Sequence, residues 1–377
     1  MNKKILWVIG IVVVVVIVVA SIRGANNNTD TIKIGFIGPL TGDAALYGEP
    51  AKNIIQMAID EINEKGGING QQIQFIPEDG KCNGKDAVSA AQKLINIDKV
   101  QVILGGFCSS ESMAIVPVAT DAKVTLFSYA SSNPSLTGIS PFFVRDYPSD
   151  SSQGEVLARI AYNDKRWRKV AFIQEQTDYS AGIFKAFSDR FQKDGGVVIK
   201  EEYSSNTNDF RSILAKLRDS NSDALFIDPQ TPASAVRIIT QMSQMNWKPA
   251  LIANDILSDP NVFPENFSFF NGAIGAKFDA SLTSSKSLSF IDAYKKKYGS
   301  EPPYLSYAET EYDSVYIVKD AILNVGNNGE NIANWLRTSV VDWEGASGKI
   351  TILSNGDRDG GHTPFVIKDA TISPYIK

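Results

Sequence analysis

Short apolar runs with the pattern of β-strands alternate with amphipathic helical stretches along most of this chain. The first unit joins a strand at 32–37 to a helix expected over 50–64, which Gly66 and Gly67 end. Further strands are predicted near 72–77, 100–104, 124–127, 169–173, 197–201 and 224–227, and further helices near 85–96, 111–121, 151–162, 181–193, 209–218 and 232–245. Such alternation is typical of parallel sheets covered by helices on both faces, so we expect an α/β fold.

The N-terminal segment has the pattern of an export signal. Lys3 and Lys4 precede an aliphatic run over 5–19, and cleavage is expected near Ala20. An uncleaved membrane anchor is the alternative, since a run of about 20 apolar residues spans a bilayer. No cysteine follows the run to carry a lipid. We therefore assign 1–29 to a leader plus linker and expect the remaining chain to lie outside the cytoplasm, secreted or anchored.

Length and charge narrow the class of protein. The roughly 350 residues after the leader exceed the size at which a single core stops growing, so two domains are expected. The formal net charge is -5, whereas general nucleic-acid binding requires a basic surface. Nucleic acid is therefore not expected as a partner.

Cys82 and Cys108 are the two cysteines of the chain. In an exported protein an even number of cysteines favours a disulfide, and two buried thiols are the alternative.

The residues needed for common catalytic sites are missing. His362 is the sole histidine, so neither a histidine-based triad nor a multi-histidine metal site can be assembled. The segment GFIGPLTG after the first strand is not a dinucleotide fingerprint, and no Walker-type glycine loop occurs. We expect no enzymatic activity, no cofactor and no metal.

A serine pair follows the apolar run at 100–104, where a parallel sheet binds ligands beyond its strand ends. Ser109 and Ser110 open the next expected helix, and helix N-termini present hydroxyls and unpaired N–H groups to carboxylates. The alternative is that Ser109, and Ser132 after the next strand, only cap helices.

Several loop segments together resemble one known family. They are GFIGPLTGDAALYGEP, DEINEKGGING, EDGKCNGKDAVSAAQKLI, GGFCSSES, SYASSNPSLT, PSDSSQG and GASGKITILSNGDRDG. In this order and spacing they are similar to the type I periplasmic binding proteins of the branched-chain amino acid and amide group, over nearly the whole mature chain.

The resemblance implies two Rossmann-like lobes with parallel sheets, joined by a hinge of three crossovers near Asp146, Phe278 and Ile350. The first lobe would comprise 30–146 and 279–350, and the second lobe 147–278 and 351–377. It also implies that the two cysteines form a disulfide in the first lobe, beside the ligand pocket.

The resemblance assigns ligand contacts in the first lobe. Ser109 and Ser132 would bind a ligand carboxylate, and Ala130 would offer its backbone carbonyl to an amine. Ser110 and Ser131 belong to the same two loops and are candidate contacts with them.

The second lobe departs from the family pattern. Family members that bind amino acids carry an acidic residue after the strand near 225–227, and here Ala233 stands at that place. Asp228 or Asp255 could supply the carboxylate for a ligand ammonium, and Gln230 could instead bond an amide.

Three aromatic residues match family positions near the ligand: Tyr47, Tyr179 and Phe278. Packing is the alternative role for an isolated aromatic side chain. Asp150, in PSDSSQG, is expected to cap the helix that follows it, and contact with the ligand pocket is the alternative.

The resemblance implies a solute-binding protein of an ABC importer that captures an amino acid or amide between its lobes. Its partners would be the small-molecule ligand and the membrane permease subunits, and we expect a monomer. The alternative is the ligand-sensing ectodomain of a membrane-anchored receptor system. A transcription regulator with the same fold is disfavoured, because the chain has an export leader and no DNA-binding module precedes the lobes.

Overall fold

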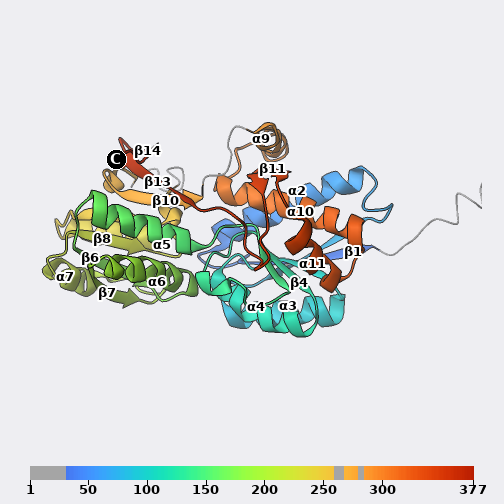
Figure 1. Ribbon diagram of the computed structural model, residues 1–377, viewed down its shortest axis with the longest axis horizontal. Helices are drawn as coiled ribbons and strands as arrows, with labels where there is room; N and C mark the ends of the chain where they lie inside the picture. Colours follow the sequence, from blue (N-terminus) through green and yellow to red (C-terminus); the bar gives the residue numbers. More distant parts are fainter. Residues whose placement is uncertain (1–30, 259–266, 279–283) are drawn as a thin grey trace, which may run out of the picture.

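The computed structural model describes residues 31–258, 267–278 and 284–377. Figure 1 shows two α/β lobes arranged end to end along the long axis of the molecule. The leader expected at 1–29 lies outside the described ranges. Within those ranges, no helix has both the length and the apolar character that a membrane span requires.

The first lobe is built on a five-stranded parallel sheet of order β2-β1-β3-β4-β5. Its strands are β1 (Ile32–Gly38), β2 (Ile73–Asp79), β3 (Val102–Gly105), β4 (Thr125–Ser128) and β5 (Phe143–Arg145). Its helices are α2 (Ala45–Glu64), α3 (Gly84–Lys93), α4 (Ser109–Asp121), α9 (Ser285–Tyr298), α10 (Leu305–Val325) and α11 (Gly329–Ser339).

The second lobe is built on a seven-stranded sheet of order β14-β13-β10-β9-β8-β6-β7. Its strands are β6 (Lys169–Glu175), β7 (Val197–Tyr203), β8 (Ala224–Asp228), β9 (Ala250–Ala253), β10 (Ile274–Phe278), β13 (His362–Lys368) and β14 (Thr371–Pro374). Its helices are α5 (Asp150–Arg159), α6 (Asp178–Lys193), α7 (Arg211–Asp219) and α8 (Pro232–Gln244). β13 and β14 are antiparallel to their neighbours, so this sheet is only mostly parallel.

Alternating side chains on the strands explain the two helical layers. In β6 and β8, Phe172 and Phe226 face Phe187 of α6, with ring centroids 6.0 and 5.2 Å from it. Ile173 and Ile227 point the other way and share a core cluster with residues of α7 and α8. Because successive strand residues point to opposite faces, apolar runs buried on both sides are expected in such a sheet. The predicted α/β class is confirmed.

The chain passes between the two sheets three times. It leaves the first sheet after β5, returns after β10 to enter α9, and leaves again after a small hairpin. That hairpin consists of β11 (Trp343–Gly345) and β12 (Gly348–Ile350). In Figure 1 the dark red segment between β11 and β13 can be followed from one lobe to the other.

The strands and helices predicted from the sequence are confirmed to within a few residues. The largest difference is at α2, which begins at Ala45 and not at residue 50. The extra turn places Tyr47 in the helix, where its side chain is buried.

Candidate functional site

A buried carboxylate, Asp255, lies where the two lobes meet. It begins the short 3-10 helix at Asp255–Ser258, directly after β9. The hydroxyls of Tyr147 and Tyr307 each donate to its Oδ2 at 3.0 Å, and the hydroxyl of Tyr179 donates to its Oδ1. Tyr179 is in the first turn of α6, Tyr307 is on α10, and Tyr147 follows β5. One carboxylate thus collects donors from both lobes.

Burial keeps these tyrosines in the donor form. Desolvation is the main cause that raises the pKa of Tyr147, Tyr179 and Tyr307 above the usual range, and the negative charge of Asp255 raises it further. Each hydroxyl therefore stays neutral at physiological pH and can donate to a carboxylate or to a ligand.

The serine residues of the first lobe have different roles. Ser132 Oγ donates to Asp150 Oδ2 at 2.6 Å and so joins the first lobe to the start of α5. Ser109 Oγ accepts the backbone N–H of Asn133 at 3.3 Å. Ser110 Oγ donates to the carbonyl of Cys82, and Ser131 Oγ to the carbonyl of Gly106, so these two hydroxyls fix loops.

The alternative that Ser109 and Ser132 only cap helices is wrong. The N-cap of α4 is Cys108, and Ser109 is the first residue inside the helix. Asn133 occupies the N-cap of the 3-10 helix that follows Ser132, and the hydroxyl of Ser132 is directed to Asp150. Ala130 is buried in the same loop as Ser131 and Ser132.

Asp150 is not the cap of α5. Ser149 occupies the N-cap position and accepts the N–H of Ser151, because its own side chain can reach that donor. Asp150 is completely buried in the first turn of α5, and its side chain faces the first lobe through Ser132. This carboxylate is therefore part of the contact between the lobes.

The second-lobe candidates lie at the ends of neighbouring strands. Asp228 ends β8 and is completely buried, and its Oδ1 accepts the side-chain N–H of Asn254 at 3.0 Å. Gln230 is buried, and its backbone N–H donates to Glu175 Oε2 at 2.7 Å. Ala233 lies in the first turn of α8. The acidic residue among the tyrosines is Asp255, after the next strand.

Aromatic side chains enclose the same region. The ring of Tyr47 lies 4.9 Å from that of Phe107 and 4.6 Å from that of Tyr304. Phe278 ends β10, and its ring packs against Tyr147 at 5.4 Å. The structure therefore brings Tyr47 and Phe278 to the tyrosine cluster from opposite lobes.

Several residues of this site are not indicated by the sequence pattern. They are Tyr147 and Tyr307, which donate to Asp255, Asn254, which donates to Asp228, and Glu175, which accepts from Gln230. The signal for Tyr147 was its place one residue after an expected crossover at Asp146. Tyr307 gave no local signal, because α10 contains other tyrosines with the spacing of packing residues.

The predicted disulfide between Cys82 and Cys108 is confirmed, with a Cα–Cα distance of 5.3 Å. Glu111 reinforces it, because its two carboxylate oxygens accept the backbone N–H groups of Cys82 and Cys108, each at 3.0 Å. The disulfide closes a covalent loop that contains α3 and β3, and it fixes the turn before Ser109.

Replacing both cysteines by serine is expected to lower the free energy of unfolding by about 3 kcal/mol. The unfolded chain would regain the freedom of a loop with a sequence separation of 26. Urea denaturation at fixed pH measures the change. Reductant should destabilise the wild-type protein to the same extent and leave the double variant unaffected. A loss below about 0.5 kcal/mol would contradict this prediction, since that is the range of neutral surface substitutions.

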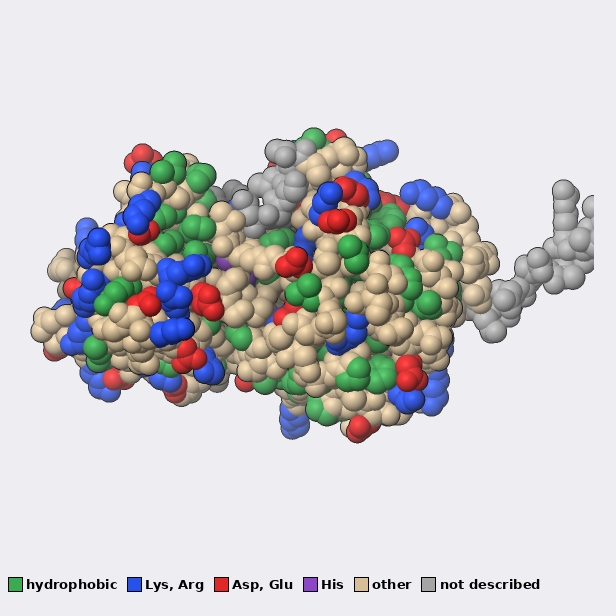
Figure 2. All heavy atoms as spheres, viewed as in Figure 1, with side chains coloured by type: hydrophobic (Ala, Val, Ile, Leu, Met, Phe, Trp, Pro, Cys, Tyr) green, Lys and Arg blue, Asp and Glu red, His purple; other side chains and the backbone are tan. Residues whose placement is uncertain are grey.

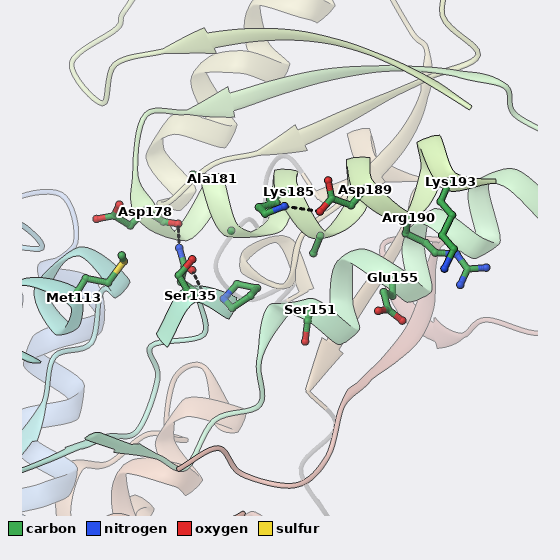
Figure 3. A pocket seen from close by; sticks show the side chains of 14 residues that line it. Met113, Ser135, Ser151, Glu155, Asp178, Ala181, Lys185, Asp189, Arg190 and Lys193 are labelled. Carbon is green, nitrogen blue, oxygen red and sulfur yellow. Dashed lines mark hydrogen bonds and ion pairs between the residues drawn. The ribbon is translucent and has the colours of Figure 1, made fainter. Parts of the chain in front are cut away.

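An open groove of about 630 Å³ lies beside the tyrosine cluster and is a competing candidate site. Figure 3 shows that its lining comes mainly from α5 and α6, with Met113 and Ser135 at the first-lobe end. Two of its charged residues, Lys185 and Asp189, pair with each other at 2.6 Å, and both are largely exposed. We favour the buried cluster, because ligand specificity comes from desolvated polar groups and this groove offers few.

On the face drawn in Figure 2, basic and acidic side chains are interspersed over both lobes. Among the residues that the structure describes, no three His, Cys, Asp or Glu side chains are grouped closely enough to hold a metal ion.

This chain resembles known proteins of one family in both sequence and structure. A family model described as periplasmic binding protein matches residues 31–367. The Leu/Ile/Val-binding protein of Escherichia coli K12 is 26% identical over 338 residues, which cover 88% of this chain and 89% of that protein. The leucine-, isoleucine-, valine-, threonine- and alanine-binding protein of Pseudomonas aeruginosa is 24% identical, with 90% of each chain covered.

Two solved structures have the same arrangement of lobes. A leucine binding protein from Thermotoga maritima is 27% identical, with a TM-score of 0.83 over 92% of this chain and 98% of that one. A branched-chain amino acid transporter substrate binding protein from Streptococcus pneumoniae, in complex with isoleucine, is 26% identical, with a TM-score of 0.79 over 91% of this chain and 98% of that one.

Proposed function

This chain belongs to the type I periplasmic binding protein family, and on that basis we propose that it is the extracytoplasmic solute-binding component of an ABC importer. Its ligand is a small polar solute, an amino acid or an amide, held between the lobes. We also propose the lobe boundaries at 146, 278 and 350, a monomeric state, and delivery of the ligand to permease subunits. The relatives named above are described as binding branched-chain amino acids, which supports the ligand class.

The observation that carries this proposal is the position of Asp255. Asp255 is 6% exposed, and its carboxylate accepts hydrogen bonds from hydroxyl groups of both lobes. These bonds therefore depend on how one lobe closes on the other. A ligand ammonium placed among the tyrosines would form a charge-assisted hydrogen bond with the Asp255 carboxylate. Ser109, Ala130 and Ser132 would hold the carboxylate and the amine from the first lobe.

Closure would follow from contacts made by the second lobe. A ligand bound only to Ser109 and Ser132 cannot shift the balance between open and closed forms, because it interacts equally with both. Contacts with Asp255 and Tyr179 form only in the closed arrangement, and they therefore favour it. The permease subunits would recognise that arrangement.

A ligand screen by thermal shift tests the proposal. The purified mature protein is expected to gain about 2.7 kcal/mol of apparent stability when its ligand is present at 100 times its dissociation constant. The panel comprises the amino acids, their amides, urea and short peptides. The groove variant Glu155→Gln, which alters an exposed side chain, should show the same shift with the same compound. The absence of a shift with every compound would contradict the proposal.

A further inference from the structure

Asp228 and Asn254 present oxygen atoms that lack hydrogen-bond partners. They lie side by side, because Ile227 of β8 pairs with Ala253 of β9. The Nδ2 of Asn254 donates to Asp228 Oδ1 and to the carbonyl of Pro229 at 2.9 Å, which turns its own oxygen away from both. Asp228 Oδ2 and Asn254 Oδ1 are then buried acceptors without a donor. Leaving such an atom unsatisfied costs its desolvation energy, so this edge is suited to receive N–H groups.

Asp150 contributes a third acceptor from α5. Its Oδ2 accepts the Ser132 hydroxyl, whereas its Oδ1 has no hydrogen bond in the described part of the chain. The nearest basic group is Nε2 of His362, at 3.7 Å from Oδ1. Burial lowers the pKa of His362 to about 4, so the imidazole is neutral and offers no positive charge.

The acceptor oxygens of Asp228 and Asp150 belong to a group of four acidic side chains. Asp150, Glu175 and Asp255 all act on Asp228 electrostatically, and none of the four carboxylates forms an ion pair with Lys or Arg among the described residues. The cation that acts on Asp150 is Arg145, which is already bound to Asp357 at 2.8 Å. An aliphatic amino acid has one ammonium group and no second cation, so its binding would leave Asp228 and Asp150 without a cationic partner.

We propose that the cleft recognises a solute with a second cationic group, an ammonium or a guanidinium, and that Asp228, Asn254 and Asp150 accept its N–H groups. The inference rests on the proposed function and narrows its ligand to basic amino acids or diamines. A cationic group with several N–H donors matches the three free oxygens, whereas a metal ion would need ligands grouped more closely than the described side chains are.

Binding of such a cation should depend on pH. Burial and the neighbouring carboxylates raise the pKa of both Asp150 and Asp228, so these carboxyl groups retain protons in the empty protein at pH values where a free aspartate is ionised. The titratable and charged groups around them are Arg145, Tyr147, Glu175, Tyr179, Tyr203, Asp255, Tyr307 and His362. A bound cation favours the ionised carboxylates, so binding releases protons and affinity rises with pH.

The test is calorimetry on the wild-type protein with L-lysine, L-ornithine and L-arginine against L-leucine and L-glutamine. We expect the best basic amino acid to bind at least tenfold more tightly than leucine or glutamine, and its affinity to rise between pH 6 and pH 8. Cadaverine serves as lysine without its carboxylate. If cadaverine also binds, the solute is a diamine; if only lysine binds, the first-lobe carboxylate site is required. Both results support a solute that carries a second cationic group.

The substitution Asp228→Asn removes the carboxylate charge and keeps the size and shape of the side chain. We expect it to weaken binding of the basic amino acid at least tenfold and to reduce the rise with pH, because Asp150 then remains to release a proton, while the thermal stability of the empty protein is retained. Leucine or glutamine binding as tightly as the basic amino acids would overturn this inference and leave the proposed function intact. Failure of every amino acid, amide and diamine to bind would overturn both. Equal affinity of wild type and Asp228→Asn for the basic ligand would also overturn the assignment.

Discussion

Asp255→Asn is expected to weaken binding of the cognate solute by at least about 100-fold, which corresponds to about 2.7 kcal/mol. The asparagine oxygen can still accept a tyrosine hydroxyl, but it carries no charge to offset the ligand ammonium. Truncating one partner of a buried, hydrogen-bonded charge pair costs about 2 to 5 kcal/mol. Titration calorimetry with the best compound of the thermal-shift screen measures the loss.

The loss should be specific to the charge at this position. Tyr179→Phe removes one hydroxyl donor but leaves the charge of Asp255 in place, so it should weaken binding less than Asp255→Asn does. Glu155→Gln, in the exposed groove, should bind like the wild type. If Asp255→Asn binds within about threefold of the wild type, below 1 kcal/mol, the ammonium site lies elsewhere.

The strand and helix pattern of the chain could be predicted because both lobes depend on local periodicity. Strands such as β1 and β6 are buried on both faces along most of their length, and their central residues are therefore apolar. The edge formed by β13 and β14 could not be predicted in the same way, because their exposed and buried residues alternate irregularly and their register depends on β10.

The site was only partly predictable. Asp255, Tyr179 and Ser132 follow strand ends, and both the topology rule and the family resemblance point to such positions. Tyr307 lies on α10 with Tyr312 and Tyr316, which bond to Glu61 on α2. Nothing local in the sequence distinguishes the tyrosine that reaches Asp255 from the two that fix helix packing, since the difference arises from how the lobes meet.

The crossing segments between the lobes carry two reciprocal charge pairs. Arg145 ends β5 and Asp146 follows it, and Asp357 and Arg358 precede β13. Arg145 Nε bonds to Asp357 Oδ1 at 2.8 Å, and Arg358 Nη1 bonds to Asp146 Oδ1 at 3.0 Å. Arg145 is completely buried, and its other donors reach the carbonyls of Ser131 and Asn133 and the hydroxyl of Thr137.

Arg145→Met is therefore expected to lower the free energy of unfolding by about 3 to 5 kcal/mol, the range for breaking one side of a buried ion pair. The methionine fills much of the volume, but the Asp357 carboxylate and two loop carbonyls lose their donor. Urea denaturation measures the change. Arg190→Met is the matched control, because Arg190 pairs with Asp194 at the protein surface, and such a pair contributes about 1 kcal/mol or less.

A second variant separates the charge effect from a packing effect. If the cost comes from the uncompensated Asp357 carboxylate, then Arg145→Met combined with Asp357→Leu should be more stable than Arg145→Met alone, because no unpaired charge remains buried. If the loss of unfolding free energy in the double variant equals the sum of the losses in the two single variants, the contacts of Arg145 with the loop at 131–137 are responsible instead. That loop carries Ser131 and Ser132. The same result would therefore mean that Arg145, in the crossing segment, holds the candidate carboxylate site in place.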